Sequence, residues 1–308
     1  MAEIRLYGPG EGEALRRLME EAFGPGAAGR PGEPPALPEG CRAWLGGSDS
    51  GGPAAFCRAV PDRETRARGR LCLDALFVSE PHRRRGLGRA LLRAAQECAR
   101  GEGLEGVWGY FPAEVPPAFL SATGGRKLRT LRFFRRGRLE SVLYPRVPQG
   151  YRVRPMSLPG DLAAAAALYN AVFARMWNFR AHAPGDIAEW FEGGDTAPEN
   201  CLLLESLSEP AGLLGMAALA VDPSRLQAGD KTAYIPDIGV VPDHRGKGWG
   251  EILIAAAAAR AREAGLAALE LIADAEDAAV CAFYRRMGFE ERGAIQVYEW
   301  GLPGESST

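Results

Sequence analysis

The chain has 308 residues, 46% of them hydrophobic and 25% charged, with a net charge of −2. This is the composition of soluble globular domains, and the length predicts two of them. The longest apolar run, 252–259, is too short to span a membrane, and the first residues lack the basic and apolar segments of a signal peptide, so we expect a cytoplasmic protein with no membrane partner.

The two halves carry opposite charge. Residues 1–150 hold 24 basic and 17 acidic side chains (+7), whereas residues 151–308 hold 13 and 22 (−9). An acidic second half argues against a nucleic-acid partner and favours a cationic ligand such as an amine, although attraction between the halves explains the asymmetry equally well. The six cysteines form no C-x-x-C pair, which predicts reduced, mostly buried thiols.

Hydrophobic periodicity predicts the elements of the first half. Strands are expected at 3–7, 41–45, 54–60, 71–78 and 106–111, and helices at 15–23, 87–98 and 119–123. Gly- and Pro-rich composition predicts loops at 24–40 and 46–52 and a linker at 145–150. The arginine-rich stretch 126–138 is interpreted as a strand pair whose arginines face solvent.

The second half repeats this order of elements. Strands are expected at 151–154, 201–207, 213–221, 235–241, 267–273 and 295–302, and helices at 161–177, 186–192, 252–259 and 277–287, the first of them capped by Asp161. The sequence therefore predicts two domains, 1–144 and 151–303, each with strands and helices around its own core.

One stretch of the second half is suited to holding a phosphate group. The strand-like run 235–241 is followed by Arg245-Gly-Lys-Gly-Trp-Gly250 and then by helical spacing. Glycines let the backbone approach a ligand, and the unpaired N–H groups that open a helix attract an anion. The candidate cofactor-binding residues here are Val240, Val241, Arg245, Gly246, Lys247, Gly248, Trp249 and Gly250.

The same stretch occurs earlier in the chain. Five of its residues recur 162 positions before, at Val78, His82, Arg83, Gly86 and Gly88. One constant offset over five positions indicates an internal repeat. The candidate binding residues of this first copy are Arg83, Arg84, Arg85, Gly86, Leu87, Gly88 and Arg89.

The pattern Arg-x-x-Gly-x-Gly after a strand resembles the acyl-CoA pyrophosphate loop of the GCN5-related N-acetyltransferase (GNAT) superfamily. Downstream, the spacing from Asp277 and Val280 to Tyr284 and Gly288-Phe289 resembles a second motif of that family, Asn-x-x-Ala-x-x-x-Tyr-x-x-x-Gly-Phe. Asp277 replaces the usual Asn and Val280 the usual Ala. Because the first motif is also repeated in tandem, the resemblance covers nearly the whole chain.

The resemblance implies an α+β fold of two tandem acyl-CoA N-acyltransferase domains, each a twisted mixed sheet flanked by helices, with the fourth and fifth strands splayed around acetyl-CoA. It implies that Tyr284 protonates the leaving thiolate, that Asp237 accepts the amine proton and that Asp277 lies near the cofactor. Tyr284 packed in the core and Asp237 as a structural carboxylate are the competing interpretations. The first copy keeps the loop and lacks the acid, because Ser121 or Ala122 falls near the place of Tyr284.

We therefore expect an N-acetyltransferase in which the second domain transfers acetyl from acetyl-CoA to a primary amine by direct attack, with an acceptor pocket near 173–190. A degenerate first copy beside a fuller second one resembles the mycothiol synthases, which implies a cysteinyl glycoside as acceptor. A non-catalytic acyl-CoA-binding or regulatory module is the alternative. The expected partner is a small-molecule amine, and the chain is expected to be a monomer or homodimer.

Two other classes fit poorly. A dinucleotide-binding fold would use Gly248 and Gly250, but Leu253 occupies its third glycine position. A metal hydrolase would need paired ligands, and the only histidines, His82, His182 and His244, form no pair at helical spacing. No metal is expected.

Overall fold

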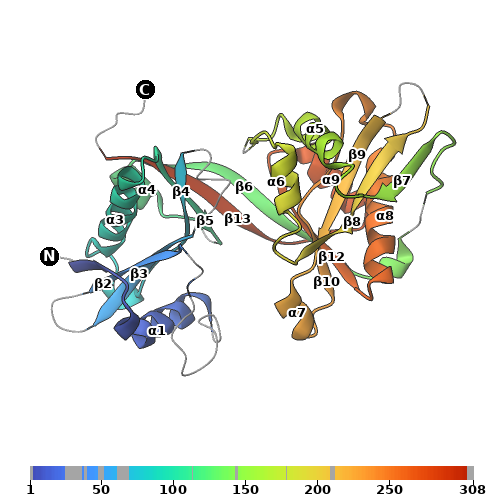
Figure 1. Cartoon of the computed structure of the whole chain (residues 1–308). Coiled ribbons are helices and arrows are strands. Elements are labelled where there is room, and N and C mark those ends of the chain that lie inside the picture. The colour runs from blue at the N-terminus through green and yellow to red at the C-terminus, as the bar shows by residue number, and fades with distance from the viewer. Residues whose placement is uncertain are drawn as a thin grey trace. The chain divides into compact units, whose positions relative to one another are not determined.

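The computed structural model describes residues 3–24, 37, 40–47, 52–60, 69–112, 114–142, 145–177, 179–208 and 212–303. The predicted loops at 24–40 and 46–52 lie mostly outside these residues. The chain forms two compact units: unit 1 comprises residues 1–130 and 295–308, and unit 2 comprises residues 131–294 (Figure 1). These units do not coincide with the two halves of the sequence, so the domain limits 1–144 and 151–303 stay a prediction.

Unit 1 is a sheet with helices on both faces. Its strands lie in the order β1 (Glu3–Leu6), β2 (Arg42–Gly47), β3 (Pro53–Val60), β4 (Arg70–Val78), β5 (Gly106–Phe111), β13 (Glu290–Gly301) and β6 (Gly125–Arg136). Strands β4 and β5 are parallel, and the neighbours on either side of them are antiparallel. Its helices are α1 (Gly12–Phe23), α3 (Leu87–Gly101) and the short α4 (Pro117–Thr123).

The alternation of side chains along β3 divides the core of unit 1 between the two faces. Phe56 belongs to the cluster of Leu15 and Leu18 on α1, whereas its neighbours Ala55 and Cys57 belong to the cluster that α3 covers. Successive residues of a strand point to opposite faces, so this apolar strand is buried on both sides. The result is a helix–sheet–helix layering.

Unit 2 repeats the layering. Its strands follow the order β6, β12 (Ala268–Asp274), β10 (Thr232–Ile235), β9 (Gly212–Ala220), β8 (Thr196–Ser206) and β7 (Tyr151–Pro155), with β11 (Ile238–Val240) paired to β9. Its helices are α5 (Leu162–Phe173), α6 (Pro184–Glu189), α7 (Pro223–Gln227), α8 (Trp249–Glu263) and α9 (Ala278–Arg286). The mixed sheet flanked by helices in each unit agrees with the predicted α+β class.

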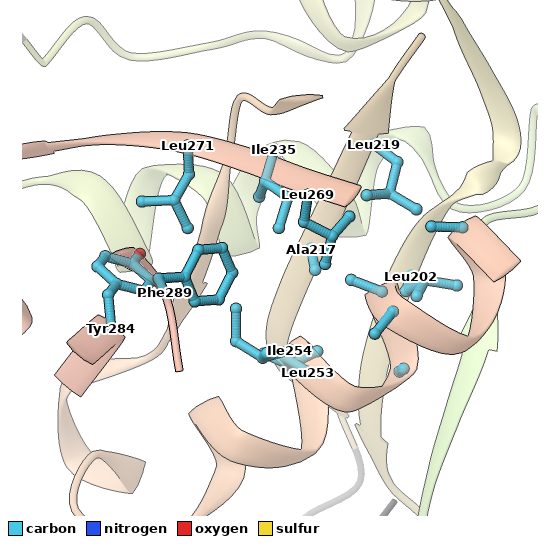
Figure 2. Close-up of a cluster of buried hydrophobic side chains, with 14 of the residues drawn as sticks. Leu202, Ala217, Leu219, Ile235, Leu253, Ile254, Leu269, Leu271, Tyr284 and Phe289 are labelled. Carbon is cyan, nitrogen blue, oxygen red and sulfur yellow. The ribbon is translucent and has the colours of Figure 1, made fainter. Parts of the chain in front are cut away.

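The core of unit 2 is also split by strand alternation. Leu202 and Leu204 of β8 pack in the cluster that contains Leu253 of α8, part of which Figure 2 shows. Cys201 and Leu203 pack on the opposite face with α5. Helix α8 contributes an unbroken buried run, Ile252 to Ala258, four of whose residues are alanines.

Two twelve-residue strands, β6 and β13, belong to both units (Figure 1). The carboxy-terminal part of β6, Leu131–Arg136, pairs with β12 in unit 2. The carboxy-terminal part of β13, Gln296–Gly301, pairs with β5 in unit 1. The prediction of a strand pair at 126–138 was therefore wrong, since these residues form one long strand whose neighbours come from the far end of the sequence.

Helix α5 also differs from its prediction. It ends at Phe173 rather than at residue 177, and Asp161 at its amino terminus makes no capping hydrogen bond. The Asp161 carboxylate instead accepts bonds from Arg154 (2.6 and 2.9 Å) and from the Ser157 N–H (2.7 Å). Arg154 holds the pKa of Asp161 below its ordinary value, so the pair ties the entry of α5 to β7.

Gly239 on β11 provides a test of this packing. A methyl group at Gly239 would overlap Val172 of α5, so Gly239→Ala should destabilise the fold by about 1–3 kcal/mol, the usual cost of overpacking. The control is Gly212→Ala on β9, where an added methyl group meets nothing within 4 Å and a change below about 0.5 kcal/mol is expected. Urea unfolding measures both; equal midpoints for the two variants would contradict the packing.

Candidate active site

The parallel strands β10 and β12 separate part-way along their length. They pair from Thr232↔Ala268 to Ile235↔Leu271, after which the chain continues as β11, which pairs with β9. A bulge causes the turn away from β12, because Tyr234 and Ile238 are four residues apart while their partners on β9 are three apart. The strand predicted at 235–241 is thus interrupted.

Asp237 lies in this bulge and is half-buried. Its backbone carbonyl accepts the N–H of Ala218 (2.8 Å), which fixes the bulge to β9. The structure therefore places the candidate base where the two parallel strands diverge.

The glycine-rich loop leaves β11 through a 3₁₀ turn at Pro242–His244 and ends at the first turn of α8. Gly246 (φ 74°) and Gly248 (φ 84°) take left-handed backbone conformations that side chains rarely adopt. A Cβ at Gly248 would meet nothing within 4 Å, so the space beside the backbone is open. The first N–H groups of an α-helix have no carbonyl partner four residues before them, and those of Trp249 and Gly250 stand at this place in α8.

Two side chains of the loop make contacts within unit 2. Arg245 donates to the carbonyl oxygens of Val240 (2.9 Å) and Val172 (2.8 Å), so its guanidinium holds the loop to β11 and to the last turn of α5. Trp249 is buried and packs against Tyr151 with ring centroids 4.5 Å apart. What the loop offers an anion is therefore its backbone N–H groups and the exposed Lys247.

The loop of unit 1 has the same geometry at the same offset of 162. Arg84 (φ 66°) and Gly86 (φ 86°) match Gly246 and Gly248, and Arg83 donates to Val78 (3.1 Å) as Arg245 does to Val240. Leu87 is buried like Trp249, whereas Arg84, Arg85 and Arg89 are exposed. Strands β4 and β5 also stop pairing at the equivalent point, Leu73↔Gly109. The repeat inferred from the sequence extends to the backbone.

The last glycine of each loop shows which residues of α4 correspond to which residues of α9. A Cβ at Gly250 would lie 3.1 Å from the Phe283 ring of α9, and one at Gly88 would lie 3.2 Å from the Phe119 ring of α4. Phe283 and Phe119 are 164 positions apart. Gly288 and Gly124, the glycines with left-handed backbone that end the two helices, are also 164 positions apart. Leu120, and not Ser121 or Ala122, therefore stands in the place of Tyr284. The alignment made from the sequence used the offset of 162 and therefore placed the counterpart of Tyr284 two residues too late.

Tyr284 is buried among aromatic rings. The ring centroids of Phe134, Phe283 and Phe289 lie 5.8, 5.3 and 5.7 Å from its own, and Figure 2 shows it beside Phe289. Burial raises the pKa of Tyr284 above its ordinary value, and the nearby Cys281 and Asp277 add to the effect. The phenol therefore keeps its proton throughout the neutral and mildly alkaline range, which is the state that a proton donor needs.

Asp237 and Tyr284 share an electrostatic neighbour. Burial, with the negative charge of Asp237 as the second cause, raises the pKa of Tyr234 to about 12. Tyr234 in turn is one of the groups that raise the pKa of Tyr284. Tyr234, on the paired part of β10, thus interacts electrostatically with both the candidate base and the candidate acid. Sequence reasoning missed Tyr234, although it lies three residues before Asp237.

Asp277 caps helix α9. Its carboxylate accepts the N–H of Val280 (3.0 Å), which is the ordinary use of a side-chain oxygen at a helix amino terminus. An Asn side chain could make the same bond through its carbonyl oxygen. The replacement of Asn by Asp in the motif therefore preserves the local structure.

The segment between α5 and α6 contains a buried histidine. The ring of His182 lies 4.2 Å from that of Tyr169 and 6.0 Å from that of Trp190. Its Nδ1 lies 3.0 Å from the carbonyl oxygen of Arg180, so Nδ1 carries the hydrogen. Asn170 bonds to both backbone polar groups of His182 (2.8 and 2.9 Å). These contacts fix the region predicted to receive the acceptor, and no spacing in the sequence indicated them.

Within the described ranges, no group of three or more His, Cys, Asp or Glu side chains could hold a metal ion. Among the helices that those ranges contain, none is long and apolar enough to cross a membrane.

Comparison with known proteins identifies the family. The model of the acetyltransferase (GNAT) family matches residues 13–114 and 164–289, well over half of the chain. The chain belongs to the GNAT family. Both copies of the repeat are matched, which confirms the predicted tandem of two GNAT domains and the prediction of an acetyl-CoA-dependent acetyltransferase.

This GNAT protein is similar to several known proteins over most of its length. A mycothiol acetyltransferase of Kocuria rhizophila is 31% identical over 70% of this chain and 71% of its own, and one of Tsukamurella paurometabola is 30% identical over 70% and 73%. Among solved structures, a GCN5-related N-acetyltransferase of Sphaerobacter thermophilus has a TM-score of 0.73 at 19% identity, covering 99% of this chain and 98% of its own. A tandem GNAT protein from the clavulanic acid biosynthesis pathway has a TM-score of 0.65 at 19% identity over 99% and 100%. The two structures support the fold alone.

Proposed function

We propose that unit 2 binds acetyl-CoA and transfers its acetyl group to the primary amine of a small molecule. The observation that supports this most strongly is the open space beside Gly248 at the start of α8, in a unit where β10 also diverges from β12. Backbone N–H groups of Gly248–Gly250 and the Lys247 ammonium would hold the pyrophosphate. Acetyl-CoA supplies the activated thioester when it is bound.

In this proposal Tyr284 and Asp237 handle the protons. Asp237 accepts a proton from the acceptor ammonium, directly or through water, so that a neutral amine can attack. Tyr284 gives its proton to the departing thiolate. The pKa of an ordinary thiol is about 8.5, so a thiolate is already a fair leaving group and the acid needs to supply only a modest part of the rate.

A cysteinyl glycoside is the acceptor class that we favour. The support is the name shared by relatives at about 30% identity, mycothiol acetyltransferase, together with the resemblance of the tandem layout to that group. A thiol-release assay with acetyl-CoA should compare cysteinyl glycosides with polyamines, aminoglycosides and amino acids. Turnover of a different class alone would overturn this acceptor, and binding without turnover of any amine would indicate a non-catalytic module.

The loop assignment predicts a difference between two matched variants. Gly248→Glu places bulk and negative charge where the pyrophosphate would lie, so acetyl-CoA turnover should fall about 10-fold or more. Gly86→Glu makes the same change in the first copy, where Leu120 replaces the acid, and should leave turnover unchanged. Gly229→Glu, at an exposed glycine with φ 84°, controls for the backbone strain. If Gly86→Glu alone loses turnover, catalysis belongs to unit 1.

Tyr284→Phe tests the proposed acid. The ring and its packing remain while the hydroxyl is removed, so kcat should fall at least about 10-fold with little change in KM for acetyl-CoA. Because burial raises the pKa of Tyr284 above its ordinary value, the protonated form persists below that pKa, and the loss should be the same at pH 7 and pH 9. The control is Tyr298→Phe in unit 1, which removes the hydroxyl that accepts the Val115 N–H (3.0 Å). Full kcat in Tyr284→Phe, with chemistry rate-limiting, would make Tyr284 a core residue.

Asp237→Asn tests the proposed base. The amide keeps the size of the side chain but cannot take a proton, so kcat/KM for the amine should fall about 10- to 100-fold. The loss should shrink as the pH rises, because more of the amine is then neutral without help. Glu263→Gln makes the same charge change at the exposed end of α8 and should have no effect. An unaltered pH–rate profile in Asp237→Asn would assign Asp237 a structural role.

A further inference from the structure

Unit 2 contains a recess that the acetyl-transfer site does not use. Its volume is about 500 Å³, and it lies between the end of β6 with the following turn and the start of β13. Four of its lining residues are arginines: Arg135, Arg136, Arg138 and Arg292. One lining residue, Glu290, is acidic, and it pairs with Arg292 at 2.5 Å. The recess therefore carries a clear excess of positive charge.

Arg136 is the unusual member of this group. Its Nε is buried and has no hydrogen-bond partner among the described residues, and burial alone lowers the pKa of the guanidinium. Its neighbour Arg135 by contrast bonds to Glu270 at 2.5 Å. A Cβ at Gly288 would overlap the Arg136 guanidinium, so that glycine makes room for the arginine. A partly desolvated cation without a carboxylate costs stability, which suggests that something outside the chain compensates it.

The repeat shows that the fold does not require a charge at this position. In unit 1 strand β13 lies beside β5 as β6 lies beside β12 in unit 2. Trp300 pairs with Val107 there and Arg136 pairs with Leu269, and 269 − 107 is the repeat offset of 162. The Trp300 indole N–H donates to the Thr123 hydroxyl (3.0 Å), so this side chain has a partner within unit 1. An aromatic residue with an internal hydrogen bond fills the place that Arg136 occupies without one.

We propose that this recess binds a small anion bearing two or more phosphate or carboxylate groups. The planar fork of a guanidinium matches both kinds of oxyanion, and the volume lies in the range of small-ligand sites. The recess is separate from the proposed acetyl-CoA site. Arg136 pairs with Leu269 near the start of β12, whereas the divergence of β10 and β12 follows Leu271, and the recess shares no residue with the Gly248 loop.

Calorimetric titration of the full chain tests the proposal, with saturating CoA present to occupy the glycine-rich loops. Inorganic pyrophosphate is one probe and citrate the other, so that the two arms distinguish phosphate from carboxylate ligands. We expect binding of at least one probe, a loss of affinity of at least about 10-fold in Arg136→Gln, and a partial loss in Arg136→Lys, which keeps the charge without the fork. Arg262→Gln, on the exposed face of α8, is the matched control and should bind normally.

Thermal unfolding without any probe gives a second readout. Arg136→Met removes a desolvated, unpaired charge and keeps much of the apolar contact, so its midpoint should be at or above that of the wild type. The probe that binds should raise the midpoint of the wild type and not that of Arg136→Met. No binding of either probe, or unchanged affinity in a folded Arg136→Gln, would overturn the proposal, and a lowered midpoint in Arg136→Met would show that the arginine serves the fold.

Discussion

Both units depend on one constraint, the pairing of the outer edges of β5 and β12. Each of these strands needs an antiparallel neighbour on its outer side, because an unpaired edge leaves backbone N–H and C=O groups available for aggregation. The neighbour of β5 is β13, from the end of the sequence, and the neighbour of β12 is β6, from the middle. Separating the chain near residue 145 would therefore leave both sheets incomplete.

This arrangement also brings opposite charges of the two sequence halves together. Arginines of β6 pair with glutamates from the second half, and both members of each pair belong to the same unit. Arg132 pairs with Glu291 and Arg135 with Glu270 in unit 2, and Arg126 pairs with Glu299 in unit 1. The stretch 126–138 was interpreted as solvent-facing because its partners lie far away in the sequence. Periodicity shows that a strand is present and which residues alternate along it, but it cannot show which strand lies beside it.

The two loops could be predicted in detail, but the alignment of α4 with α9 could not. A left-handed backbone demands glycine at few positions, so Gly86 and Gly248 left a clear pattern at a constant offset. The short helix α4 has no such marker until Gly124, and a two-residue shift moved the place of Tyr284 to Leu120. The break in the strand at Asp237 was equally hidden, because a bulge changes hydrogen bonding without changing composition. Tyr284 itself was located by its motif, which also contains Phe289, and Phe283 precedes it on α9, but the sequence did not indicate that Phe134 of β6 packs against it.

One of those neighbours gives the first half of the sequence a place in the proposed chemistry. Phe134 lies on β6, and its ring packs against Tyr284 (5.8 Å) while the Arg285 guanidinium lies 5.8 Å from the same ring. The burial that keeps the Tyr284 phenol protonated is thus supplied partly by a strand that precedes the second repeat. The first copy has Leu120 where the acid would be, and its own loop is not needed for turnover in the proposed mechanism. Strand β6, the last strand of the first copy, nevertheless contributes Phe134 to the surroundings of the proposed acid. The second copy therefore does not form these surroundings from its own residues alone.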